Sequence, residues 1–312
     1  MNTVFNRRTV LMAAAVGAST TLLQACGGGD DEPHRNIVEV AQNTPDLSIL
    51  VEAVVAAGLA PTLSTGTLTV FAPTNAAFAA LLTELGVTKQ ALLANKPLLT
   101  AVLAYHVLSS TVPLASVPVG KAITPVGGGF FKIESTRGLK ITDGRNRVSN
   151  ITANDIQASN GVVHLVDRVL LPANKDIVAT AQALPDFSIL VEAVVAAGLV
   201  ETLQGTGPFT VFAPTNAAFA ALLAELGVSK AALLADKAML TKVLTYHVLP
   251  SRVLKAEVPV GKPITTVQGQ TFTINASLQI TDQNARVVNL VGTDVFTSNG
   301  VIHVVDRVLL PA

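Results

Sequence analysis

The sequence predicts an α+β protein built from two copies of one domain. Half of the 312 residues are apolar and only 13% are charged, which is enough apolar material for substantial cores. Long segments recur at a spacing of about 140 residues. Within each copy, helical patterns come first and patterns of alternating apolar and polar residues follow, and this order favours the α+β class over alternating helices and strands.

The repeat is close enough to align by eye. TVFAPTNAAFAALL stands at 69–82 and again, unchanged, at 210–223. NGVVHLVDRVLLPA at 160–173 returns at 299–312 with two conservative changes. A period of this length is too long for a solenoid unit, so each copy is a complete domain. We expect domains at 37–173 and 174–312, joined without a long linker and therefore touching.

Helical signals fill the first part of each copy. In the first copy Pro-Asp opens a helix with Asp46 placed to cap it, and Gly58 ends it. The TLTVFAP segment then predicts a strand. Thr74 or Asn75 caps the next helix, which closes at Gly86, and two more helical segments follow.

Strand signals fill the second part. From Val112 onward apolar residues alternate with polar ones in short runs that Gly, Asn and Asp separate. The Ser-Asn-Gly sequence at 159–161 predicts a tight turn that pairs the last strand with the one before it.

The N-terminus predicts export. Residues 1–25 combine a basic start, a short apolar run and small residues, which is typical of a signal peptide, and Arg7-Arg8 suits the twin-arginine type. Leu-Gln-Ala before Cys26 resembles a lipobox, so we expect a lipidated Cys26 followed by a flexible tether over 26–36. Gly27 favours the outer membrane, and a periplasmic or extracellular location is the alternative.

Composition and motifs argue against several function classes. The chain is formally neutral and has no tryptophan, so a nucleic-acid partner is not expected. The sequence has no nucleophile elbow, zinc-protease or phosphate-loop motif, and its single cysteine is Cys26. We therefore expect neither catalysis nor a cofactor.

Four histidines lie in apolar surroundings at matching places in the two copies. His164 and His303 lie in the last strand of each copy, and His106 and His247 each follow a tyrosine. They are interpreted as buried, hydrogen-bonded anchors. The alternative is a metal or acid–base site, but two histidines per copy with no cysteine make a poor ligand set.

These motifs, in this order and spacing, resemble the fasciclin domain in tandem: TVFAPTNAAF, the Tyr-His pair and NGVVHLVDRVLLP. The resemblance implies a compact antiparallel β-sandwich or barrel-like core flanked by helices. It also implies a role in adhesion and matrix contact.

The resemblance further implies candidate adhesion contacts at the Tyr-His pair and at an Asp-Ile pair before the NGV ending. In this sequence the candidates are Tyr105, His106, Asp155 and Ile156, with Tyr246, His247, Asp294 and Val295 in the second copy. A purely structural role for the same residues stays open.

The functional expectation is a non-enzymatic envelope protein that binds protein or polysaccharide through two fasciclin domains. Linking two weak binding sites raises avidity, which would explain the duplication. The alternative is a periplasmic ligand-binding module that uses an apolar cleft between helices and sheet.

Overall fold

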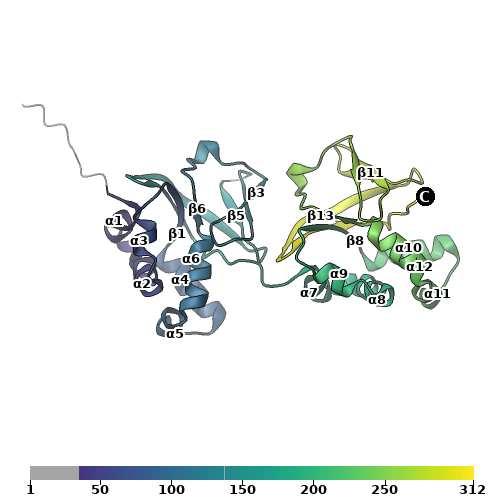
Figure 1. Cartoon of the computed structure of the whole chain (residues 1–312), viewed down its shortest axis with the longest axis horizontal. Coiled ribbons are helices and arrows are strands. Elements are labelled where there is room, and N and C mark those ends of the chain that lie inside the picture. Colours follow the sequence, from purple (N-terminus) through teal and green to yellow (C-terminus); the bar gives the residue numbers. More distant parts are fainter. Residues whose placement is uncertain (1–34, 137) are drawn as a thin grey trace, which may run out of the picture. The chain divides into compact units, whose positions relative to one another are not determined.

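The computed structural model describes residues 35–136 and 138–312 (Figure 1). The predicted signal peptide, Cys26 and nearly all of the predicted tether lie outside the described residues. The first domain contains helices α1 Ile37–Gln42, α2 Ser48–Ala57, α3 Ala60–Leu63, α4 Asn75–Leu85, α5 Lys89–Ala94 and α6 Lys96–Tyr105, 3₁₀ turns η1 Pro45–Leu47 and η2 Leu114–Ser116, and strands β1 Leu68–Pro73, β2 Val107–Leu108, β3 Ala122–Ile123, β4 Phe131–Glu134, β5 Lys140–Thr142, β6 Val148–Ala158 and β7 Gly161–Val166.

The second domain repeats this order. It contains helices α7 Ile177–Gln182, α8 Ser188–Ala197, α9 Val200–Gln204, α10 Asn216–Leu226, α11 Lys230–Ala235 and α12 Lys237–Tyr246, 3₁₀ turns η3 Pro185–Phe187 and η4 Lys255–Glu257, and strands β8 Phe209–Pro214, β9 Val248–Leu249, β10 Pro263–Thr265, β11 Thr271–Ile274, β12 Gln279–Thr281, β13 Val287–Thr297 and β14 Gly300–Val305. In each domain the helices gather on one side of the sheet (Figure 1). The predicted α+β class is confirmed.

Each domain has one seven-stranded sheet. The strand order is β2-β1-β7-β6-β5-β4-β3 in the first domain, and the second domain follows the same order. Most neighbours are antiparallel, but β1 runs parallel to β7. The expected antiparallel core is present, and this parallel pair is an addition that the sequence patterns did not predict. After α4–α6 the chain first adds β2, which runs antiparallel to β1, and β7 joins the other side of β1 only after β3–β6. A connection this long can place two strands side by side in the same direction, which a tight hairpin cannot.

The predicted turn at the end of each copy is present. Ala158 pairs with Gly161 across a two-residue turn, and the strands on either side form the β6–β7 hairpin. The side-chain oxygen of Asn160 accepts from Ile37 N at 2.9 Å, and its amide donates to Leu63 O, so the turn also holds the start of the helical layer.

The helix caps agree with the sequence at most positions. Gly58 has φ 73° and ends α2, and the Thr74 hydroxyl caps α4 by accepting from Ala77 N. Asp46, however, caps nothing: it lies inside η1, and its side chain makes no cap hydrogen bond. The side chain of Asn75 accepts from Ile49 N at 2.9 Å instead, a partner distant in sequence that local pattern reasoning could not supply.

In each domain two apolar cores share one strand, β1 or β8, and β1 is buried along its whole length. Val70 and Ala72 point into the core under the helices, whereas Phe71 points into the core enclosed by the curled sheet. A strand covered on both faces favours a continuous apolar run, which explains the sequence VFAP, and the one polar residue before it, Thr69, is buried with its hydroxyl donating to Ser110 O.

Candidate functional site

The two Tyr-His pairs lie at the C-terminal ends of helices α6 and α12 and are buried. Tyr105 and His106 are 0% and 1% exposed, and Tyr246 and His247 are equally buried. The Tyr105 hydroxyl donates to Phe130 O, and the Tyr246 hydroxyl donates to Thr271 O at 2.9 Å. Burial raises the pKa of Tyr246 to about 12, so this donor keeps its proton. These side chains join the last helix to the sheet and present no surface to a partner.

His106 and His247 are neutral links between a helix and the C-terminal segment of their domain. The Nδ1 of His106 lies 2.7 Å from Val102 O, and its Nε2 accepts from Leu170 N at 2.9 Å. A carbonyl only accepts and an N–H only donates, so the proton must sit on Nδ1. His247 repeats both contacts. Burial lowers the pKa of each ring to about 4.

His164 and His303 hold the opposite tautomer. The Nδ1 of His303 accepts from Asp294 N at 3.2 Å, and its Nε2 lies 2.9 Å from Val253 O. His164 makes the same two contacts, to Asp155 N and Val112 O. Each ring thus connects the β-bulge in β6 or β13 to the loop that leads into η2 or η4.

A metal would need a ring nitrogen with a free lone pair. In all four of these histidines, both ring nitrogens face main-chain groups, which is the arrangement that the anchor interpretation requires. Within residues 35–136 and 138–312, no group of three or more His, Cys, Asp or Glu side chains is placed to hold a metal ion.

Replacing His303 by alanine tests its anchor role. Asp294 N and Val253 O would lose their partner and a void would open, so we expect the unfolding free energy to fall by at least about 1–3 kcal/mol. Thermal unfolding measures this, with His164→Ala as the matched change in the first domain. Zinc or a chelator should leave the wild-type melting temperature unchanged. A chelator that lowers it would restore the metal alternative.

Asp155 and Asp294 occupy a left-handed backbone position in the bulge, with φ 55° and 60°. One carboxylate oxygen of each accepts from the first residue of a 3₁₀ turn earlier in the chain: Asp155 from Leu114 N of η2 at 2.9 Å, and Asp294 from Lys255 N of η4 at 2.8 Å. Both candidate contacts therefore have a structural task that sequence patterns did not reveal.

The second carboxylate oxygen distinguishes the two copies. In Asp294 it accepts from Lys132 Nζ, which belongs to the other domain, at 2.8 Å. Lys132 also pairs with Glu134 at 2.7 Å. Burial alone lowers the pKa of Lys132, but its hydrogen bonds to Asp294 and Glu134 outweigh burial, so the net pKa is raised. In Asp155 the second oxygen instead accepts from the side-chain amide of the neighbouring Asn154 at 3.3 Å.

This ion pair is part of a junction between the two domains. Phe130 and Phe296 pack with ring centroids 4.7 Å apart, and Arg252 lies over the Phe130 ring at 4.3 Å. The Asn146 side chain donates to Phe296 O at 3.0 Å and accepts from Phe296 N at 2.6 Å, as a paired strand would. The domains are thus joined by apolar, ionic and main-chain contacts, and the expectation that they touch is met.

Apart from Asp294, which matches Asp155, the junction residues named above differ between the two copies. In the repeat alignment Phe130, Lys132 and Asn146 correspond to Thr271, Thr273 and Ala285 of the second copy, and Phe296 corresponds to Gln157 of the first. Sequence reasoning missed these residues because it concentrated on what the copies share. The signal that could have found them is divergence at positions inside an otherwise repeated pattern.

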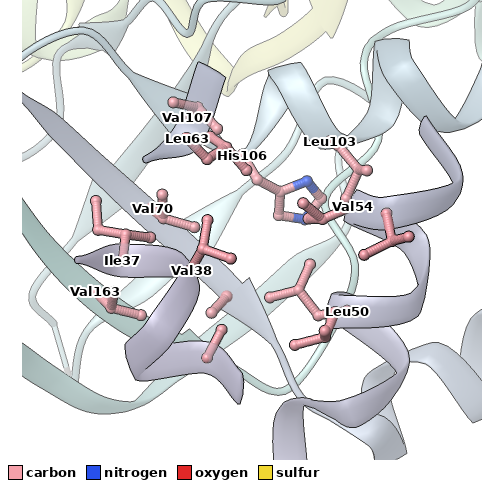
Figure 2. Close-up of a pocket in the computed structure, with 14 residues that line it drawn as sticks. Ile37, Val38, Leu50, Val54, Leu63, Val70, Leu103, His106, Val107 and Val163 are labelled. Atoms are coloured by element: carbon pink, nitrogen blue, oxygen red, sulfur yellow. The ribbon is translucent and has the colours of Figure 1, made fainter. Parts of the chain in front are cut away.

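The apolar cleft of the alternative interpretation is small in both copies. Under α2 a cavity of about 30 Å³ is lined by Ile37, Leu50, Val54, Val70, Leu103 and His106 (Figure 2). Its counterpart under α8 has the same volume. Ligand pockets usually measure hundreds of Å³, whereas a cavity of this size holds about one or two waters. Neither cavity has room for a ligand as it stands.

Two segments of the chain, residues 45–172 and 185–311, match the Fasciclin domain family. The chain belongs to the fasciclin-domain family. The predicted tandem of fasciclin domains is confirmed, since each match covers one copy of the α+β unit described above.

Relatives of this fasciclin protein occur in bacteria and animals. Protein sll1483 of Synechocystis sp. is 46% identical over 138 residues, which are 43% of this chain and 73% of that protein. Transforming growth factor-beta-induced protein ig-h3 of Sus scrofa is 30% identical over 258 residues, 79% of this chain and 35% of that protein, so the chain spans about a third of this animal relative. A solved FAS1 domain pair from the insect cell adhesion molecule Fasciclin I covers 85% of this chain and 97% of its own, with 18% identity and a TM-score of 0.41.

Proposed function

We propose that this fasciclin protein is a non-enzymatic adhesion protein of the cell envelope that binds an extracellular or envelope protein or polysaccharide. Membership of the family supports adhesion. The enclosed histidines support a structural core without acid–base chemistry, because a general base needs a nitrogen that can reach a substrate.

We further propose that export and anchoring depend on the N-terminus, with residues 1–25 removed and Cys26 lipidated at the outer membrane. The lipobox-like sequence and the Gly-rich, acidic stretch after it support this. None of the helices in the described part of the chain is long and apolar enough to span a membrane. In the described part of the chain the first helix, α1, is capped by Asn36.

The observation that carries the proposed function is the unequal exposure of β6 and β13. In the second copy the outer side of the bulge, Asp294 and Phe296, is buried against the first domain. In the first copy the matching strand leaves Asn154 and Gln157 exposed and Asp155 half-buried. This surface therefore joins the domains in the second copy, whereas in the first copy it is exposed and can contact a partner.

This proposal predicts that a bulky charge on the open β6 surface weakens adhesion. We expect Gln157→Arg to lower retention of the purified protein on envelope or host-matrix material several-fold, with an unchanged melting temperature because Gln157 is exposed. Val291→Arg, an exposed change on β13, is the matched control. Equal retention of both variants would contradict the use of β6. If neither the wild type nor any variant is retained on any such material, the adhesion proposal itself fails.

A further inference from the structure

A cleft of about 630 Å³ lies where the two domains meet, beside the junction. This volume is within the usual range for small-ligand sites, which often lie at domain interfaces. Its walls come from the loop before β6, the interdomain segment at 174–175, helix α7 and strand β13. The Lys132–Asp294 and Asn146–Phe296 contacts line it and hold its two sides together.

The charge of the cleft is positive. Lys132, Arg145 and Lys175 line it against a single acid, Asp294. The charge of Lys132 is already neutralised by its ion pairs with Asp294 and Glu134. Arg145 and Lys175 remain as the cations that can meet a ligand.

Arg145 is held in place with donors to spare. Its main-chain N–H donates to Asp143 Oδ1 at 2.9 Å, and its Nε reaches Pro172 O at 3.4 Å. The loop is packed so tightly that a Cβ at Gly144 would collide with the main-chain nitrogen of Ala173. Among the described residues none accepts a hydrogen bond from the two Nη groups, so a fixed guanidinium edge is available for a carboxylate.

Lys175 is positioned by its main chain, because its carbonyl accepts from Ser298 N at 2.8 Å while the residue stays exposed. The other polar side chains of the lining are neutral hydroxyls and amides, Thr142, Asn174, Thr180 and Thr293, and the apolar ones include Leu184 and Val295. Two cations, several neutral hydrogen-bonding groups and an apolar surface match a sugar ring that carries a carboxylate.

We infer that this cleft binds uronic-acid units of a carboxylated polysaccharide, with Arg145 and Lys175 on the carboxylate and the neutral side chains on the hydroxyls. The inference rests on the proposed adhesive function and names its partner class. The second copy cannot supply the same site, since Asn284 stands at the position of Arg145 and Thr273 at that of Lys132.

Binding of the full chain to three polymers tests whether both the carboxylate and the hydroxyl groups of the ligand are recognised. Polygalacturonate should bind. Fully methyl-esterified polygalacturonate, which keeps the hydroxyls but loses the charge, should bind at least about tenfold more weakly, since a charged hydrogen bond contributes about that factor. Polyacrylate, which has the charge without the hydroxyls, should also bind at least about tenfold more weakly. If polygalacturonate does not bind, or if polyacrylate binds equally well, the inference is overturned.

Substitutions in the cleft test whether the polysaccharide binds there. Arg145→Asn introduces the residue of the second copy, and together with Lys175→Gln it should weaken polygalacturonate binding more than tenfold without changing the melting temperature. Lys262→Gln with Arg307→Asn removes the same charge from exposed positions outside the cleft and should change binding less than twofold. If both double variants lose binding equally, or if the Arg145 and Lys175 variant loses none, the cleft is not the binding site. If matrix retention persists while the cleft pair binds polygalacturonate normally, only this inference fails and the adhesive function stands.

Discussion

Each domain should lose about 2 kcal/mol of unfolding free energy between neutral pH and about pH 5, because one histidine in each must stay neutral to fold. Burial lowers the pKa of His106 and His247 from 6.5 to about 4. Well above pH 6.5 both the folded and the unfolded state are neutral at these rings, and the stabilisation is complete. As the pH falls from 6.5 towards 4, the unfolded chain takes up protons that the folded domain cannot accept, so the stabilisation is progressively lost.

Urea unfolding at a series of pH values measures this loss. His303, whose pKa burial also lowers, should make the second domain somewhat more acid-sensitive. Replacing His247 by glutamine should reduce the pH dependence of the second domain to the part that His303 contributes, while the first domain, which keeps His106, provides the internal control. A wild-type profile that is flat between pH 6.5 and 5, or a variant with the wild-type slope, would show that these rings do not control acid stability.

Lys132→Thr should destabilise the two-domain protein by about 3–5 kcal/mol, although threonine is what the second copy carries at this position. The side chains of Lys132 and Asp294 are only 10% and 3% exposed. Removing the lysine leaves a buried carboxylate without its cation, and desolvation makes such a charge costly. Equilibrium unfolding of the full chain measures the effect.

A second substitution separates the ion pair from general disruption of the junction. Asp294→Asn keeps an oxygen to accept from Lys255 N but carries no charge. The double variant Lys132→Thr, Asp294→Asn should therefore be more stable than Lys132→Thr alone, with a coupling energy of about 1–3 kcal/mol. Thr281→Lys, an exposed change in β12, is the control for altered charge. Strictly additive effects of the two junction substitutions would mean that the ion pair does not stabilise the junction.

Local sequence patterns predicted several features that depend only on residues close together in the chain. Gly58 ends its helix because only a residue without a side chain adopts its left-handed conformation at little cost, and Thr74 caps its helix through an N–H three residues on. The Ser-Asn turn before Gly161 is equally local. Duplication and resemblance then extended these elements to a tandem of fasciclin domains.

The site required distances between residues far apart in the chain. The alternating pattern of β7 places His164 in the interior, but its partners Val112 and Asp155 come from other segments. Asp155 and Asp294 look equivalent in sequence, yet Asp294 has a lysine from the neighbouring domain. Arg145 stood out in no motif, because its importance depends on the cleft around it.

The sequence by itself determined two repeated α+β domains, most of their helix caps, their final hairpin and the burial of the histidines, because these follow from the repeat, from periodicity and from local residue chemistry. Only the tertiary structure decided which carbonyl and N–H each histidine joins, why β1 runs parallel to β7, and how Lys132, Asn146 and Phe296 join the copies. The physical reason is that these contacts bring together groups as many as 162 residues apart, and their energy depends on burial and distance that no local pattern encodes.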